Sequence, residues 1–333
     1  MIAAKASATR RAARAAAPPD WPAAARALAA GAETICGQLG PSQQHDFNAL
    51  WDRLRLPRPA KAAGVPPALA LPLPLLPWFC GRRLRRQGVR VPRRAVQEAA
   101  LAAVLGYMAV RLHDDRLDEA AGSEATALLT GSVLLTHHLR LLASAAGARG
   151  SVEVLQQATQ AWARYAEGMA VEVQATVDGA TWTESIWQAS LLRYAPMALP
   201  SIALCIRVGK AGEVQRSVAL FSALGEAHQL FEDVVDLAED VRGQRGGWVA
   251  ELCGVRENAL LGERFGYIAG IGPVLDRAHQ RLDEARAIAQ ELGETELVGH
   301  LDARETAMRK WLLERQEAMV RALLGARRGT MSD

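Results

Sequence analysis

Apolar side chains recur with the three- to four-residue spacing of α-helices along most of this 333-residue chain. The pattern predicts two short helices within residues 21–56, broken near Gly40 and Pro41, followed by a proline-rich connection. A long helix is predicted next, starting at Pro92, because proline suits the first turn of a helix. It leads into the acidic segment that begins at His113.

Five further segments and a last one near the C-terminus keep the same helical spacing. The predicted ranges are residues 125–145, 152–176, 183–208, 214–242, 265–292 and 302–324. The links between them are short or contain glycine, which favours antiparallel neighbours in a bundle. No segment alternates with the two-residue period of a half-buried strand, and no repeat of fixed length is present.

The composition supports an all-α chain, because half of the residues are apolar and only 5% are aromatic. We therefore predict a single helical domain over residues 21–325, preceded by a disordered tail at 1–20. The net charge of +3 gives no global field of the kind that nucleic-acid binding requires. The four cysteines have no paired spacing, which fits a reducing cytoplasm and indicates neither a zinc site nor a disulfide framework.

The longest apolar stretch near the start, residues 68–79, contains three prolines and is too short to span a bilayer. The first residues are rich in alanine and arginine but lack the apolar core of a signal peptide. We expect a soluble, cytoplasmic protein without a membrane span.

The first acidic cluster lies at the end of the long helix. Asp114 and Asp118 are four residues apart and share one helical face, with Asp115 beside them. Like charges this close repel one another, and a bound cation removes that conflict. An acidic helix end that is simply solvated is the alternative, but the apolar helix that precedes the cluster favours a core helix whose end faces a cavity.

The second acidic cluster lies in the segment QLFEDVVDLAED, which begins at Gln229. Glu232, Asp236 and Asp240 share one helical face, and Asp233 adjoins it. Mg²⁺ prefers oxygen ligands and retains several waters, so carboxylates from two facing helices can hold it together with the oxygens of a diphosphate.

These paired clusters resemble the two aspartate-rich motifs of the class I isoprenoid synthases, the superfamily of trans-prenyl diphosphate synthases and terpene synthases. DDRLD resembles their first motif, and QLFEDVVDLAED resembles the second, with Glu232 in place of its first aspartate. The resemblance covers roughly residues 80–260. It implies an antiparallel helical bundle around a central cavity, a prenyl diphosphate substrate and three Mg²⁺ ions. The metal ligands that it implies are Asp114, Asp115, Asp118, Glu232, Asp233, Asp236 and Asp240.

The resemblance also implies basic and polar residues that contact the substrate. Arg193 stands where the prenyl synthases carry a lysine that contacts diphosphate, and Gln229 opens the second motif. GRRLR, with Arg82, Arg83 and Arg85, is a loose counterpart of a basic element that binds isopentenyl diphosphate. Arg304, Arg309 and Lys310 near the C-terminus are candidates for a lid over the diphosphate. An ordinary basic surface explains each of these groups equally well.

Three functions follow from these residues. Because no arginine pair follows the first motif, we favour a terpene synthase that ionises one allylic diphosphate and lets the cation cyclise or lose a proton. A chain-elongating synthase that adds isopentenyl diphosphate is the alternative, favoured by the prenyl-type second motif. A non-catalytic helical partner subunit is the third, although both acidic clusters are retained. A homodimer is left open.

Overall fold

A computed structural model of the protein describes residues 21–54, 56, 75–118, 124–242, 247–253 and 263–329. Only the helical backbone is described for residues 21–22, 115–118, 124–125, 238–242, 263–270, 315 and 318–329. Within the described ranges the chain forms helices and no strand, as predicted. The helices are α2 (Trp21–Cys36), α3 (Pro41–Arg53), α4 (Leu75–Arg86), α5 (Arg93–Asp118), α6 (Glu124–Val177), α7 (Glu184–Ser190), η2 (Leu191–Ala198), α8 (Leu199–Arg207), η3 (Ala211–Glu213), α9 (Val214–Arg242), α10 (Trp248–Leu252), α11 (Glu263–Leu292) and α12 (Thr295–Gly329).

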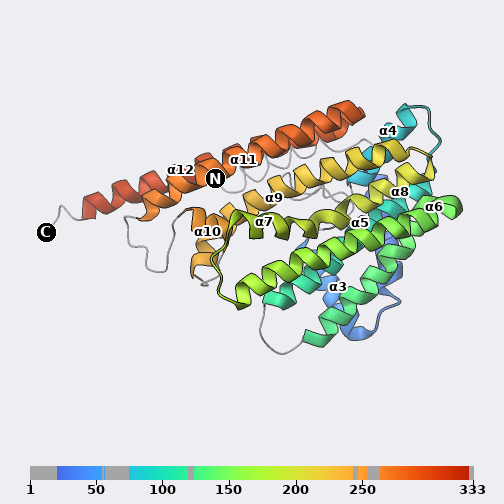
Figure 1. Ribbon diagram of the computed structural model, residues 1–333, viewed down its shortest axis with the longest axis horizontal. Helices are drawn as coiled ribbons and strands as arrows, with labels where there is room; N and C mark the ends of the chain where they lie inside the picture. The colour runs from blue at the N-terminus through green and yellow to red at the C-terminus, as the bar shows by residue number, and fades with distance from the viewer. Residues whose placement is uncertain are drawn as a thin grey trace.

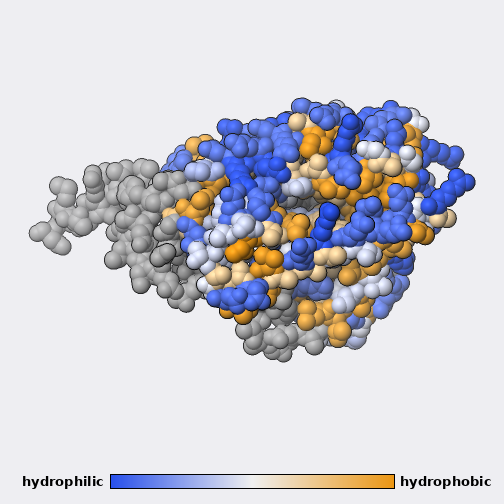
Figure 2. Space-filling view, in the orientation of Figure 1, coloured by the Kyte–Doolittle hydropathy of each residue, from blue (hydrophilic) through white to orange (hydrophobic). Residues whose placement is uncertain are grey.

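The long helices run side by side along the longest axis of the molecule (Figure 1). The most extensive packing joins α5 to α6, α9 to α11 and α6 to α8. α11 and α12 lie along one edge of the bundle and α3 lies at the opposite edge. On the face shown in Figure 2, hydrophilic residues cover much of the surface and hydrophobic residues are interspersed among them.

The two helices that carry the acidic clusters begin and end close to the predicted bounds. α6 differs, because the predicted connection near residue 147 is a sharp break at one residue. Gly147 has a φ of 75°, a conformation that favours glycine, and the chain reverses there between two helical halves.

α4 was not predicted, because prolines interrupt this part of the sequence. Pro77 lies in the first turn of α4, where a backbone N–H has no partner within the helix, so the proline costs little. Residues Leu75 to Leu84 bury almost every side chain in the core. The predicted tail at residues 1–20 lies outside the described residues.

Two helical stretches, Arg93–Asp114 and Glu184–Arg207, are long and apolar enough to cross a membrane. Most of each stretch is buried inside the bundle, which is what the core helices of a packed domain show. They are weak evidence for a membrane span.

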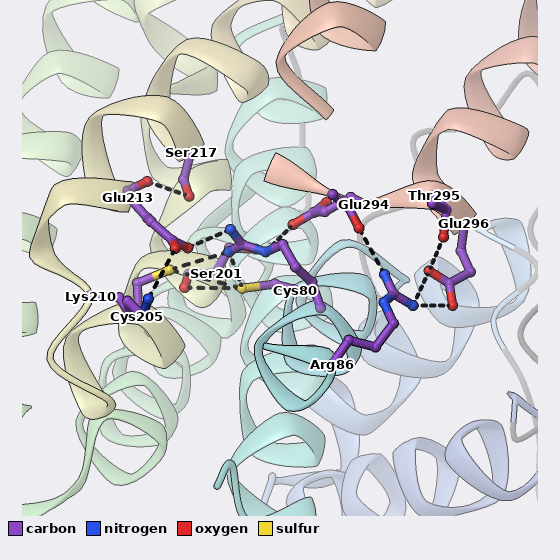
Figure 3. A network of polar contacts seen from close by, with 12 residues as sticks. Cys80, Arg86, Ser201, Cys205, Lys210, Glu213, Ser217, Glu294, Thr295 and Glu296 are labelled. Atoms are coloured by element: carbon purple, nitrogen blue, oxygen red, sulfur yellow. Dashed lines mark hydrogen bonds and ion pairs between the residues drawn. The ribbon is translucent and has the colours of Figure 1, made fainter. Parts of the chain in front are cut away.

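A buried polar network joins four helices at one end of the bundle (Figure 3). The Arg83 guanidinium forms an ion pair with Glu213 before α9 and another with Glu294 before α12, where its Nε lies 3.2 Å from the carboxylate. It also donates to the Cys80 and Cys205 thiols, whose sulfur atoms are 4.0 Å apart. Burial raises the pKa of Glu294 to about 7, although Arg83 acts in the opposite direction.

Arg83 is only 1% exposed and pairs with both Glu213 and Glu294, so removing its charge takes the buried counter-ion away from two carboxylates at once. We predict that Arg83→Gln lowers the free energy of unfolding by about 3–5 kcal/mol at pH 8, where Glu294 is ionised. Urea unfolding followed by circular dichroism measures this loss. The control is Arg86→Gln, because Arg86 pairs with Glu296 at 2.6 Å but is 41% exposed. It should cost less than about 1 kcal/mol, and equal losses in the two variants would contradict a structural role for Arg83.

Candidate active site

The first acidic cluster lies at the C-terminal end of α5, as predicted. Asp114 is half-buried and accepts a long contact of 3.4 Å from Arg111 on the preceding turn. Asp115 and Asp118 fall in the last turn of α5, and their side chains lie outside the described residues. Apolar residues of α5, among them Met108 and Ala109, are fully buried just before this end. The acidic cluster therefore lies at the end of a helix that is otherwise part of the core.

The second acidic cluster lies on α9. Glu232 and Asp236 are one turn apart and both are accessible, while Val234 and Leu237 on the other face are buried. Burial raises the pKa of Glu232, and the like charge of Asp236 adds to this effect. The side chain of Asp240 lies outside the described residues. Glu232 and Asp236 thus form a pair of repelling carboxylates, which a cation relieves.

Gln229 and Asp233 form hydrogen bonds within the protein. Tyr194 Oη donates to Gln229 Oε1 at 2.6 Å, and the Gln229 amide donates to one Asp233 oxygen. Trp187 Nε1 donates to the other Asp233 oxygen at 3.1 Å. Burial raises the pKa of Asp233 to about 6. These hydrogen bonds join α9 to α7 and η2. The roles of Gln229 in substrate binding and of Asp233 in metal binding stay predictions.

Arg193 on η2 is the basic residue that the structure brings to the two clusters. Its side chain is 13% exposed, and Nη1 lies 2.8 Å from Glu172 on α6. Burial is the largest single effect and lowers the pKa of Arg193, but Glu172, Tyr194, Asp114 and Asp233 together outweigh it, so the pKa is raised. Carboxylates of both clusters therefore stabilise the charged form of Arg193.

Two tyrosines lie close to the acidic clusters, and one of them, Tyr107, is affected by acids of both α5 and α9. Burial raises the pKa of Tyr107, with Glu232 on α9 and Asp114 on α5 contributing in the same direction. Burial also raises the pKa of Tyr165 on α6, and Asp114 is the next contributor. The sequence analysis did not identify either tyrosine. Tyr107 could have been found, because it lies two turns before Asp114 on the same face of the helix.

The basic residues of α12 divide into two groups. Arg304 is fully buried, and its Nη2 donates to His228 Nδ1 at 2.7 Å, one turn before Glu232. Burial lowers the pKa of Arg304 to about 10, against the opposing charge of Glu232. Arg309 and Lys310 are exposed, and Arg309 pairs with Glu305 of its own helix. Arg304 is therefore the residue of α12 that reaches the second cluster.

The prediction that GRRLR contacts the substrate is wrong for a substrate bound at the acidic clusters. Arg83 is enclosed in the network of Figure 3, and Arg82 pairs with Glu296 at 3.0 Å. Arg85 Nε donates to the Val91 carbonyl at 3.2 Å, which places it beside the start of α5. Asp114 lies at the other end of α5, about 30 Å away at the helical rise per residue.

The donor set of the site suits a hard divalent cation. Asp114, Glu232 and Asp236 offer carboxylate oxygens on two helices that act on a common interior. Among the described residues no group of three or more His, Cys, Asp or Glu side chains is close enough to hold a metal by itself. Mg²⁺ commonly binds with one or two carboxylates, waters and substrate phosphates, so these residues fit it.

The sequence matches no protein-family model and no curated protein. The fold is similar to that of solved prenyl synthases. A geranylgeranyl pyrophosphate synthase from Lactobacillus brevis matches with a TM-score of 0.63 and 15% identity over 84% of this chain and 95% of its own. A polyprenyl synthase from Caulobacter crescentus, complexed with calcium and isoprenyl diphosphate, matches with a TM-score of 0.54 and 19% identity over 84% and 98%. A geranylgeranyl pyrophosphate synthase from Corynebacterium glutamicum matches with a TM-score of 0.54 and 17% identity over 91% and 98%. The helical bundle of the class I isoprenoid synthases is therefore the fold of this chain, as predicted.

The placement of the carboxylates predicts how the site binds an anion with its metal. Asp114→Asn and Asp236→Asn should each weaken the Mg²⁺-dependent binding of inorganic diphosphate about tenfold or more, because each removes a charged oxygen ligand. Isothermal titration calorimetry with and without Mg²⁺ measures the affinity. Glu153→Gln, at an exposed acid of α6, is the matched control and should bind as the unaltered protein does. Unchanged affinity in both aspartate variants would remove the metal assignment.

Proposed function

We propose that this protein is a Mg²⁺-dependent enzyme that acts on prenyl diphosphates, and that its reaction begins when diphosphate leaves an allylic carbon. One observation carries the proposal. Acids of α5 and of α9 act together on the same interior groups, Arg193 and Tyr107, at the end of an apolar bundle. That arrangement suits a charged leaving group at the mouth and a hydrocarbon chain inside.

Asp114, Glu232 and Asp236 would bind the metal ions. The other members of the predicted ligand set that would join them are Asp115, Asp118 and Asp240. Bound Mg²⁺ supplies Lewis acidity that offsets the charge growing on the departing diphosphate. Three ions are proposed on the basis of the family resemblance. The calcium and isoprenyl diphosphate in the Caulobacter crescentus enzyme support a metal-bridged diphosphate of this kind.

The protein's own residues bind and orient the leaving group. Arg193 would donate hydrogen bonds to the diphosphate, and its pair with Glu172 keeps the guanidinium directed toward the two clusters beforehand. Gln229 and Trp187 fix Asp233, which holds α9 and its two accessible acids in position. The buried apolar residues of α5 keep bulk water from the chain.

Chain elongation is the subtype that the similar structures support. The three named neighbours are prenyl diphosphate synthases, and the match spans nearly the whole of each. In this reaction the alkene of isopentenyl diphosphate attacks the allylic cation and the product keeps one diphosphate. The comparisons favour this subtype over the terpene synthase that the sequence analysis favoured.

One observation favours reaction of a single allylic substrate instead. The basic segment expected to hold isopentenyl diphosphate lies at the other end of the bundle, and Arg83 within it is enclosed. Elongation then requires a second basic pocket built from other residues. Without one, the cation cyclises or loses a proton, as in a terpene synthase. This is the second candidate function.

A non-catalytic partner subunit is a weaker explanation, because the described acids Asp114, Glu232 and Asp236 are all retained at one site. A cytoplasmic location and a homodimer are predictions from the sequence and its resemblance, and we keep them as proposals.

Product analysis separates the candidates. The protein is incubated with Mg²⁺ and geranyl, farnesyl or geranylgeranyl diphosphate, each with and without isopentenyl diphosphate. Elongation predicts longer diphosphates only when isopentenyl diphosphate is present, whereas a terpene synthase forms a hydrocarbon or alcohol from the allylic substrate alone. Chelation of Mg²⁺, or Asp114→Asn, should lower either product at least about a hundredfold.

Glu153→Gln serves as the matched control in this assay and should form product at the rate of the unaltered protein. Absence of any product from every allylic substrate, with a folded protein by circular dichroism, would overturn the proposed function.

A further inference from the structure

One end of the bundle carries more exposed cations than exposed acids. The turn after α4, the first turn of α5, the break in α6, the turn after α8 and the start of α9 form this end (Figure 1). Its exposed basic side chains, which we call the basic end, are Arg86, Arg90, Arg93, Arg94, Arg149 and Arg216. Among the described residues beside them, Glu153 and Glu291 are exposed acids. The whole chain has a net charge of only +3, so positive charge is concentrated here.

The network in Figure 3 connects α4 to the start of α9 beneath the basic end. Arg83 pairs with Glu213, which lies directly before α9. Arg86 follows Arg83 by about one turn of α4, and Arg216 follows Glu213 by three residues. The exposed Arg86 and Arg216 therefore flank the same ion pair, although 130 residues separate them in the chain.

A second set of contacts joins α5, α6 and α8 at the same end. Arg94 pairs with Glu98 at 2.9 Å, and Glu98 accepts a hydrogen bond of 2.9 Å from the Ser144 hydroxyl. The Ser144 carbonyl, just before the break in α6, accepts from Arg207 at the end of α8 at 3.3 Å. Arg149 follows directly after that break. The exposed arginines of α5 and α6 therefore belong to one surface.

Most acids of this end lie beneath its surface. The side chains of Glu98, Glu213 and Glu296 are at most 20% exposed, whereas Arg94 is 86% exposed. Each of these glutamates pairs with an arginine or lysine. The outermost charges are therefore mostly positive, and a positive surface of this kind attracts anions.

Two helices begin with cations at this end. Arg93 and Arg94 open α5, and Arg216 lies in the first turn of α9. Neither first turn contains an acid. The positive end of a helix dipole disfavours cations and favours anions. The repulsion among the arginines adds to this effect, and binding of an anionic partner removes both.

Exposed apolar side chains lie beside Arg149. Val152 is 67% exposed and Leu155 is 38% exposed, and the spacing of three residues places both on the face of α6 that carries Arg149. A surface that combines arginines with exposed apolar side chains is typical of proteins that lie on a membrane. Surfaces for single-stranded nucleic acid instead expose aromatic rings, and the aromatic residues of α4, Trp78 and Phe79, are buried.

We propose that the basic end binds the surface of a membrane that contains anionic phospholipids. The arginines would pair with lipid phosphates, and Val152 would enter the layer of headgroups. Asp114 lies at the other end of α5, about 30 Å away along the helix. This separation is several times the distance over which charges act in physiological salt, so an anionic membrane does not repel the acidic clusters. The inference goes beyond the proposed function and does not depend on it.

Flotation of the full-length protein with lipid vesicles tests the proposal. We expect binding to vesicles of phosphatidylcholine mixed with phosphatidylglycerol, and at least about tenfold weaker binding to phosphatidylcholine alone. Binding to the mixed vesicles should decrease as the salt concentration rises, because salt screens the attraction. Equal affinity for the two kinds of vesicle, or no binding to either, would overturn the proposal.

Surface variants locate the binding to the basic end. Arg90→Gln combined with Arg93→Gln should weaken binding about tenfold or more, since each cation near an anionic surface contributes about fivefold. Val152→Ser should also weaken it, because an apolar contact is lost. The matched control is Arg26→Gln combined with Arg164→Gln, which removes two exposed arginines outside the basic end. Equal binding by the control and the Arg90/Arg93 variant would contradict the assignment.

Two further measurements distinguish other partners. Tighter binding to a single-stranded RNA oligonucleotide than to the mixed vesicles would overturn the proposal in favour of nucleic acid. A dimer that becomes a monomer in the Arg90/Arg93 variant, as measured by light scattering, would overturn it in favour of a second copy of the chain. Turnover of prenyl diphosphates without vesicle binding would overturn this inference alone. Vesicle binding without turnover would support it and count against the proposed function only.

Discussion

The repulsion between Glu232 and Asp236 on α9, beside an interior that Asp114 of α5 also reaches, is the constraint on which the rest of the site depends. Asp114 ends a helix whose preceding residues are buried, and Glu232 and Asp236 stand one turn apart on a second core helix. Placing acids beside the interior costs free energy when they are ionised. Burial and the like charge of Asp236 both raise the pKa of Glu232, which reflects that cost. A cation and an anionic ligand that carries its own oxygens would turn that cost into binding energy.

The fold offsets this repulsion by placing buried arginines close to the acids. Arg193 reaches the region from η2, and Arg304 reaches it from α12 through His228. At the opposite end of the bundle, Arg83 performs a structural task between the buried Glu294 and the partly buried Glu213. The protein thus uses buried arginines at both ends, and only those near Asp114 and Glu232 are placed to meet a substrate.

Much of the fold followed from helical periodicity, because α5 and α9 carry long apolar stripes with clear ends. α4 was missed because its prolines suggested a loop, and only the tertiary structure shows that Pro77 occupies a harmless first-turn position. Spacing placed Asp114, Glu232 and Asp236 on their faces, yet it could not show at which end of the bundle GRRLR lies. The carboxylate partners of Arg83 are more than a hundred residues away in sequence, so that pairing has no local signal.

The packing around His138 was equally hidden from sequence reasoning. Only the structure shows that His138 Nδ1 lies 2.8 Å from the Ala102 carbonyl oxygen and that the rings of His138, Trp162 and Tyr165 pack edge to face. Contacts of this kind have no local signal, whereas the two acidic clusters are visible as short motifs.

A crystal structure with Mg²⁺ and an unreactive allylic thiolodiphosphate tests the central claim most directly. The account predicts that the diphosphate lies between Asp114 and the Glu232–Asp236 face, bridged by metal ions and contacted by Arg193, with the prenyl chain inside the bundle. A diphosphate bound instead at the far end beside Arg82 and Arg86, or bound at the mouth without any metal ligated by these acids, would contradict it.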